Sequence, residues 1–145
     1  MSSDLFSLKG KTALVTGSST GLGKRMAVAL GQAGARVAMN YFNNEHRAAK
    51  TLLEFEETGA EGAMIRADVT DESDVNQLVA ETEKKLGPVD IVILNATPDQ
   101  PQKPIEEYDW EFYQQMINFF VKSPYLLTRA TIGKMKQNKW GRIVR

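Results

Sequence analysis

Cysteine is missing from the sequence, and histidine is represented by His46 alone. Disulfide bonds, thiolate metal sites and a cysteine nucleophile are therefore excluded within these residues, and one imidazole is too few for a histidine-rich zinc site. We expect no metal centre. The 145 residues are 42% hydrophobic, which suits one globular domain with its own core.

An excess of charge of either sign is also missing, because eighteen Lys and Arg residues balance eighteen Asp and Glu residues. A chain without net charge has no long-range field that attracts nucleic acid or an anionic membrane. No apolar run reaches the roughly 18 residues that span a bilayer, and the first residues lack a basic head followed by an apolar core. We therefore expect a soluble, cytoplasmic protein without nucleic-acid or membrane partners.

Short apolar runs alternate with segments of helical periodicity, which is typical of parallel strands joined by crossover helices. The runs predict strands at 12–16, 37–39, 63–67 and 89–94, with a fifth beginning at 143. The last and longest helical segment, 109–138, contains Pro124 and should be kinked there. The sequence predicts an α/β fold: a Rossmann-type, doubly wound parallel sheet with helices on both faces, truncated within strand five.

Apolar positions at helical spacing predict which side of each helix faces the sheet. Asn44 should cap the second helix, and either Thr70 or Asp71 should cap the third. The predicted inward positions are Leu22, Met26, Ala29, Leu30 and Ala33 in the first helix, Ala48, Leu52 and Phe55 in the second, and Val75, Leu78, Val79, Thr82 and Leu86 in the third.

A glycine-rich turn follows the first predicted strand and precedes the first predicted helix. Gly17 permits a sharp turn, Gly21 lets a phosphate approach the backbone, and Gly23 lets the helix pack closely on the strand. Backbone N–H groups and the positive end of the helix dipole then face an anion. With the hydroxyls of Ser19 and Thr20 as further donors, the turn predicts a binding site for a nucleotide pyrophosphate.

The spacing of these glycines resembles the TGxxxGxG signature of the short-chain dehydrogenase/reductase family. Segments at 68–69, 94–97, 118 and 141–144 match the same family, so the resemblance covers residues 9–144. It implies a single NAD(P)-binding Rossmann domain over 1–145 that is incomplete at its carboxyl end. It also implies that the complete enzyme transfers hydride between nicotinamide and a carbonyl or secondary alcohol.

The resemblance carries implications for individual residues. Asp68 and Val69 would contact adenine, and Asn118 would hold a catalytic water through its backbone carbonyl, although it can equally be a residue that only shapes the helix kink. Asn95 can equally be a turn residue that caps its strand. Leu94 and Thr97 replace the usual Asn and Gly of their motif. The candidate cofactor-binding residues are Gly17, Ser19, Thr20, Gly21, Leu22, Gly23, Asn40, Tyr41, Asp68, Val69, Asn95, Ala96 and Thr97.

The end of the second predicted strand bears on the choice between NAD and NADP. An acidic residue there would bind the ribose hydroxyls of NAD and repel the 2′-phosphate of NADP. The neutral Asn40 takes this position, and Tyr41 follows it. Around them, Ser19, Thr20, His46 and Arg47 can offer donors and some positive charge to a phosphate. The sequence therefore favours NADP, with NAD still possible. Arg47 can also be a solvated helix residue.

The family's reaction uses a Ser and a Tyr-x-x-x-Lys pair in which the ammonium lowers the pKa of the tyrosine. Among the tyrosines only Tyr125 has a cation four residues later, Arg129, and this pair lies in the long helical segment rather than after the fifth strand. The family's catalytic residues are expected beyond Arg145, so this polypeptide is predicted to be inactive alone. A catalytically silent nucleotide-binding or assembly module is the alternative.

The long helical segment is apolar on more than one side between Phe112 and Leu127. One side can cover the sheet, and a second must contact something else. Relatives in the family commonly pair this helix with its copy in another subunit. We therefore expect a homo-oligomer, whose complete form acts on a small-molecule carbonyl or alcohol.

Overall fold

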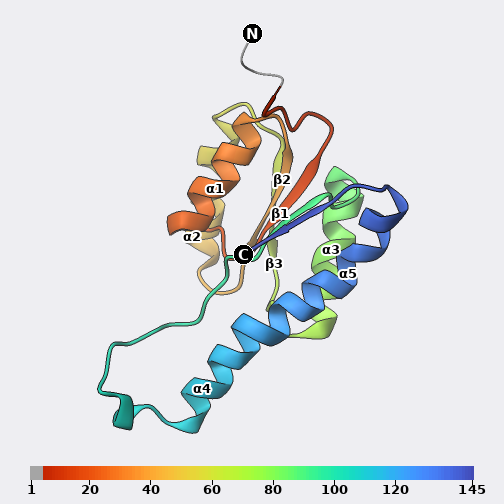
Figure 1. Ribbon diagram of the computed structural model, residues 1–145. Coiled ribbons are helices and arrows are strands. Elements are labelled where there is room, and N and C mark those ends of the chain that lie inside the picture. The colour runs from red at the N-terminus through yellow and green to blue at the C-terminus, as the bar shows by residue number, and fades with distance from the viewer. Residues whose placement is uncertain (1–4) are drawn as a thin grey trace.

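A five-stranded parallel sheet lies at the centre of the computed structural model, with helices on both of its faces (Figure 1). The structure describes residues 5–145, so the first four residues of the predicted domain lie outside the described part. The order of strands in the sheet is β3-β2-β1-β4-β5, and all neighbours are parallel. This topology confirms the doubly wound α/β fold. The strands are β1 (Thr12–Val15), β2 (Arg36–Tyr41), β3 (Gly62–Arg66), β4 (Ile91–Ile93) and β5 (Arg142–Val144).

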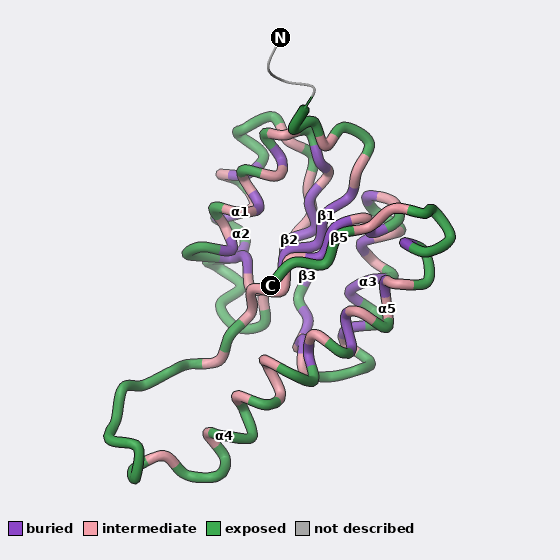
Figure 2. The backbone as a smooth tube through the Cα atoms, viewed as in Figure 1, coloured by how far each residue is buried: buried purple, intermediate pink, exposed green. Residues whose placement is uncertain are grey.

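Two separate apolar cores form because successive side chains of a strand point to opposite faces of the sheet. Leu14 and Ala38 pack toward α3 (Glu72–Leu86) and α5 (Ser123–Gln137), whereas Val15 and Val37 pack toward α1 (Gly21–Gln32) and α2 (Glu45–Glu56). All four of these strand residues are fully buried. Figure 2 shows the buried stretches concentrated in β1, β2 and β4 and in the helix sides that face the sheet. Continuously apolar central strands are therefore explained by burial on both faces.

The predicted inward side of α1 was wrong at Leu22 and Ala29, which are exposed. The buried residues of this helix are Gly23, Ala27 and Gly31. A Cβ added to Gly31 would lie 2.8 Å from the Cβ of Ala60, so the helix packs too closely for a larger side chain. Small residues form the contact surface here, and apolar periodicity alone does not reveal them.

The caps and inward side of α2 and α3 follow the prediction more closely. The side-chain oxygen of Asn44 accepts a hydrogen bond of 2.9 Å from the backbone N–H of Arg47. Asp71 caps α3 by accepting from the N–H of Asp74 at 2.9 Å, which decides between the two expected caps. The predicted inward residues of α3 are all buried, namely Val75, Leu78, Val79, Thr82 and Leu86.

The long helical segment is divided into α4 (Trp110–Ile117), a π-helical turn η2 (Asn118–Lys122) and α5, after a short 3₁₀ turn η1 (Ile105–Glu107). The backbone N–H of Ser123 donates to the carbonyl of Asn118, which widens the helix by one residue before Pro124. Pro124 follows in the first turn of α5 and has no N–H to donate to the preceding turn, and the carbonyl of Phe120 accepts from the Arg145 guanidinium at 2.7 Å instead. The irregularity that the sequence placed at Pro124 takes the form of this π-helical turn.

Helix α4 extends beyond the sheet, as Figure 1 shows. None of its residues is buried. Within residues 5–145, no helix combines the length and the apolar character needed to cross a membrane.

Candidate functional site

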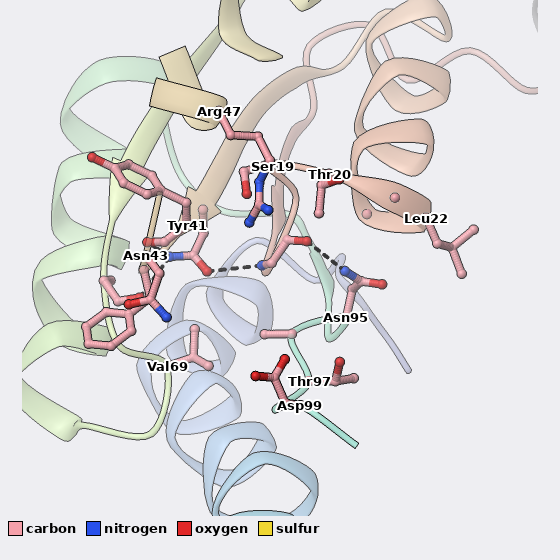
Figure 3. Close-up of a pocket in the computed structure, with 17 residues that line it drawn as sticks. Ser19, Thr20, Leu22, Tyr41, Asn43, Arg47, Val69, Asn95, Thr97 and Asp99 are labelled. Atoms are coloured by element: carbon pink, nitrogen blue, oxygen red, sulfur yellow. Dashed lines mark hydrogen bonds between the residues drawn. The ribbon is translucent and has the colours of Figure 1, made fainter. Parts of the chain in front are cut away.

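A cleft of about 520 Å³ opens at the carboxyl ends of β1, β2 and β4. The strand order reverses at this point, with β2 on one side of β1 and β4 on the other, which is where open α/β sheets bind their ligands. Figure 3 shows the side chains around the cleft. Among the predicted site residues, those that line it are Gly17, Ser19, Thr20, Gly21, Leu22, Gly23, Asn40, Tyr41, Val69, Asn95, Ala96 and Thr97.

The glycines of the turn perform separate tasks. Gly17 adopts φ of +61°, a left-handed conformation that disfavours other residues, and a Cβ there would lie 2.8 Å from the Cα of Ala96. A Cβ on Gly23 would lie 2.4 Å from Nδ2 of Asn95, so this position has no room for a side chain. A Cβ on Gly21 would meet nothing within 4 Å. Gly21 therefore borders open space, as a backbone that approaches a ligand must.

The amino end of α1 faces the same cleft without being capped. Thr20 occupies the N-cap position, makes no side-chain capping hydrogen bond, and is followed by a first turn without acidic residues. The first N–H groups of a helix have no acceptor within the helix and carry a partial positive charge. The turn therefore offers a site for an anionic group, and the donors it presents fit a pyrophosphate.

Asn95 links the end of β4 to the glycine-rich turn. Its Nδ2 donates to the carbonyl oxygens of Thr16 and Gly17, each at 3.0 Å. The N–H groups of Asn95 and Ala96 donate to Oγ1 of Thr16 at 3.0 and 3.1 Å. The side chain of Asn95 thus ties the end of β4 to the end of β1 and the glycine-rich turn, and it also lines the cleft.

Asn40 is 2% exposed, and its side-chain atoms bind the surrounding backbone. Its Oδ1 accepts from the N–H of Gly17 at 3.1 Å, and its Nδ2 donates to the carbonyls of Ile65 and Ala67 at 3.3 and 3.1 Å. The amide group thereby joins the glycine-rich turn to the end of β3. After Asn40, the chain lines the cleft with Tyr41, Phe42 and Asn43.

Two buried hydroxyl groups that the sequence did not single out also support the turn. Oγ of Ser18 donates to the carbonyl of Val15 at 2.7 Å and accepts from the N–H of Asn40 at 3.0 Å. Oγ1 of Thr51, from α2, donates to the carbonyl of Ser19 at 2.7 Å. The Ser18–Asn40 and Thr51–Ser19 bonds span 22 and 32 residues of sequence, so no local pattern would have revealed them, whereas the bond from Ser18 to Val15 is local. Phe42, Asn43 and Ala67 are further lining residues that were not predicted. Arg47 lines the cleft as well, whereas His46 does not.

Asp68 does not line the cleft. Its Oδ1 accepts from the backbone N–H and the hydroxyl of Thr70 at 2.8 and 2.7 Å, and its own N–H donates to Oδ2 of Asp74 at 2.8 Å. These bonds shape the turn between β3 and α3. Its neighbour Val69 lies in the cleft lining and is 3% exposed.

Asn118 also lies outside the cleft lining. Its side-chain oxygen accepts from Nε2 of Gln114 at 3.2 Å, and its carbonyl accepts from the N–H of Ser123 within η2. Within the described residues, no group of three or more His, Cys, Asp or Glu is placed to hold a metal ion.

An uncapped helix over a glycine-rich turn, at the reversal of strand order in a parallel sheet, defines a Rossmann-type nucleotide-binding domain. Comparison with protein-family models identifies the family. The model described as "short chain dehydrogenase" matches residues 11–145, so the chain belongs to the short-chain dehydrogenase family.

Curated relatives include dehydrogenases and reductases. The chain is 33% identical over 144 residues to a 2-dehydro-3-deoxy-D-gluconate 5-dehydrogenase of Formosa agariphila, covering 99% of this chain and 54% of that protein. It is 37% identical over 145 residues to a sorbose reductase of Candida albicans, covering 97% of this chain and 50% of that protein. The chain thus spans about half the length of the curated relatives it matches.

Solved structures show the same relationship. A short-chain type dehydrogenase/reductase from Mycobacterium marinum superposes with a TM-score of 0.88 at 33% identity, covering 99% of this chain and 58% of that one. A blue fluorescent protein from a metagenomic library, solved in complex with NADPH, superposes with a TM-score of 0.80 at 31% identity, covering 94% of this chain and 55% of that one.

Proposed function

We propose that the cleft binds a nicotinamide dinucleotide, with NADP(H) preferred. The observation that supports this most directly is the uncapped amino end of α1, which faces the cleft. Gly21 has no side chain there, so the backbone N–H groups remain open to a ligand. The NADPH complex of a structural relative supports the same choice of ligand. The pyrophosphate would then lie at Gly21, Leu22 and Gly23, where first-turn N–H groups are available.

The two halves of the dinucleotide would extend in opposite directions from the pyrophosphate. By the rule for Rossmann folds, the adenosine ribose lies at the end of β2, beside Tyr41 and Asn43. The nicotinamide half would then lie toward the end of β4, beside Asn95 and Thr97. Asp68 and Asn40 would act indirectly, because their side chains bind the protein backbone.

The preference for NADP rests on the charges at the adenosine end. Arg47 lines the cleft there and can donate charge-assisted hydrogen bonds to a 2′-phosphate. Tyr41, at the position that follows the buried Asn40, carries no charge that would repel the phosphate. Both features favour NADP(H) over NAD(H).

We propose further that the whole protein is an oxidoreductase acting on a carbonyl or secondary alcohol. Bound nicotinamide would supply or accept the hydride, and the names of two relatives, a deoxy-gluconate dehydrogenase and a sorbose reductase, make polyhydroxylated carbonyl compounds the first class to test. The 145 residues contain no Tyr-x-x-x-Lys sequence. We therefore propose that Asn118 contributes no proton transfer here and that these residues bind the cofactor without turnover.

Calorimetric titration of the chain with NADPH and NADH tests the binding proposal. We expect binding of both, with NADPH tighter, and absence of binding to either would contradict it. A spectrophotometric assay of the 145 residues with NADPH and a panel of ketoses, keto acids and simple ketones tests the proposal that they bind the cofactor without turnover. We expect no oxidation above the uncatalysed rate, since general acid catalysis typically contributes about 100- to 10,000-fold.

Self-association through α4 and the residues that follow is the remaining proposal. Exposed apolar side chains recur along one stripe, with exposed fractions of 70% at Trp110, 63% at Val121 and 54% at Tyr125. Tyr113 and Ile117 continue the stripe between them. A contiguous apolar stripe of this kind is typical of a protein interface, and a second copy of the helix offers a matching surface.

A further inference from the structure

Phe42 is a large aromatic side chain that remains 43% exposed although it lines the cleft. It follows β2 directly, at the adenosine end of the proposed site. A single exposed aromatic residue is common on protein surfaces and needs no ligand to explain it. The position of Phe42 becomes informative because a second residue holds it in place.

Arg66, the last residue of β3, fixes both the backbone and the ring of Phe42. Its Nε donates to the carbonyl of Phe42 at 3.1 Å, and its guanidinium carbon lies 4.9 Å from the centre of the ring. The parallel register places Arg66 beside Tyr41, the residue that precedes Phe42. A cation over an aromatic ring is a favourable contact that restricts the ring. Phe42 is therefore held at the edge of the cleft rather than free to rotate.

Two apolar residues that follow β3 complete this end of the cleft. Ala67 and Val69 line it, although they are only 2% and 3% exposed. A purine ring has two π faces that pack well on aromatic and aliphatic groups, and stacking of bases on aromatic side chains tolerates changes in the base. Adenosine lies on the β2 side of a Rossmann fold, so the heterocycle beyond the ribose would reach this surface.

We infer that Phe42, positioned by Arg66, is the stacking surface for the adenine ring of the bound dinucleotide. The inference rests on the proposed cofactor site and assigns a specific contact within it. In this arrangement Arg66 acts through Phe42 and does not bind the ligand. Arg47, which lines the cleft, remains the cation available to a 2′-phosphate.

The role of Phe42 is tested by calorimetric titration of the chain and its Phe42→Ala variant with NADPH, NADH and 5′-AMP. We expect all three ligands to bind about 10-fold more weakly to the variant, equivalent to about 1.4 kcal/mol. Phe42→Trp should retain the affinity, because the indole preserves the π face. Phe6→Ala removes a ring that is 77% exposed and lies outside the cleft lining, and it should leave all affinities within about 2-fold. Urea unfolding of each variant checks that the fold is kept.

The role of Arg66 is tested by comparing Arg66→Met and Arg66→Lys with the same ligands. If Arg66 positions the ring, Arg66→Met weakens NADPH and NADH by the same factor, about 3- to 5-fold, and Arg66→Lys restores only part of it. Weakening confined to NADPH would identify Arg66 as a phosphate ligand and overturn its positioning role. Dinucleotide affinities within about 2-fold for Phe42→Ala would overturn the stacking inference. Failure of the unaltered chain to bind either dinucleotide would instead refute the proposed cofactor site and the inference with it.

Discussion

Asn95 and Thr16 are joined by two hydrogen bonds of 3.0 Å, one from Nδ2 of Asn95 to the Thr16 carbonyl and one from the Asn95 N–H to the Thr16 hydroxyl. The same hydroxyl accepts from the N–H of Ala96 at 3.1 Å. These bonds fasten the carboxyl ends of β1 and β4 together immediately before the glycine-rich turn. The start of the glycine-rich turn is therefore held in place relative to the sheet.

Replacing Thr16 by Val keeps the shape of the side chain and removes the acceptor shared by the Asn95 and Ala96 N–H groups. Thr16 is 1% exposed, so water cannot easily take its place. We expect Thr16→Val to lower the free energy of unfolding by about 2 kcal/mol, measured by urea denaturation. Thr97→Val, at an exposed position, is the matched control and should be close to neutral. Equal stability of the two variants would contradict this role of the hydroxyl.

An acidic residue introduced at position 40 should lower the stability of the fold, whereas one introduced at position 41 should change the preference between NADPH and NADH. Asn40→Asp would place a carboxylate against the carbonyls of Ile65 and Ala67, which now accept from the amide. We expect a loss of about 3 kcal/mol in unfolding free energy, because the buried carboxylate would face two carbonyl acceptors and keep only the Gly17 N–H as a donor. Tyr41→Asp should fold normally and shift the preference toward NADH. A stable Asn40→Asp protein that prefers NADH would show that the side chain at position 40 faces the ligand instead.

Arg47 is expected to account for much of the preference for NADPH. Its guanidinium lines the cleft, and a hydrogen bond between charged groups contributes about 1.5–3 kcal/mol. Arg47→Ala should therefore weaken NADPH by at least about 10-fold and leave NADH within about 2-fold. The control is Arg25→Ala, which removes an exposed cation of α1 that is not part of this lining. If both dinucleotides weaken equally, Arg47 supports the site without contacting the phosphate.

Self-association should depend on the apolar stripe that begins in α4. Val121→Glu introduces a charge where the side chain is 63% exposed, and we expect it to reduce the size of the oligomer measured by light scattering. Leu53→Glu, on α2, is an equally exposed control at 63% and should leave the size unchanged. Phe120→Glu is a less specific test because the Phe120 ring packs under the Arg145 guanidinium. A monomeric unaltered chain at high concentration would contradict the proposal.

The ion pair between Lys24 and Glu54 joins α1 to α2 and should give a pH-dependent contribution to stability. A hydrogen bond from the Lys24 ammonium holds the pKa of the Glu54 carboxyl below its ordinary value; partial desolvation opposes the shift, and the charges of Lys24 and Lys50 add to it. Because the pKa is lower in the folded state, the stabilisation is present above the unfolded-state pKa and is lost as the pH falls through the folded-state pKa.

We therefore expect Lys24→Met to lower the urea midpoint slightly at neutral pH, with the difference disappearing in acid. The effect should be small, since exposed ion pairs contribute little. Arg25→Met is the control for removal of one positive charge from α1. A difference that persists unchanged at acidic pH would show that Lys24 acts through packing instead.

The sequence alone was sufficient to predict those features that depend on residues close together in the chain. The alternation of apolar runs and helical periodicity predicted the parallel sheet, and the glycine spacing predicted the turn, because both depend on residues a few positions apart. The caps at Asn44 and Asp71 act on N–H groups three residues away, so their side-chain chemistry was readable directly. The inward side of α1 was misjudged because glycine carries no hydrophobic signal, although Gly23 and Gly31 are buried and make the close contacts of this helix.

The tertiary structure decided which side chains face the ligand and which hold the backbone. The bond from Asn95 to Thr16 spans 79 residues of sequence, and that from Gly17 to Asn40 spans 23. Phe42 and Arg66 meet only because β2 and β3 lie side by side. A polar side chain at a strand end satisfies whichever donors and acceptors the neighbouring strand brings within reach. The direction of the Asn40 amide is therefore a property of the assembled sheet, whereas the presence of the sheet and its glycine-rich turn is a property of the sequence.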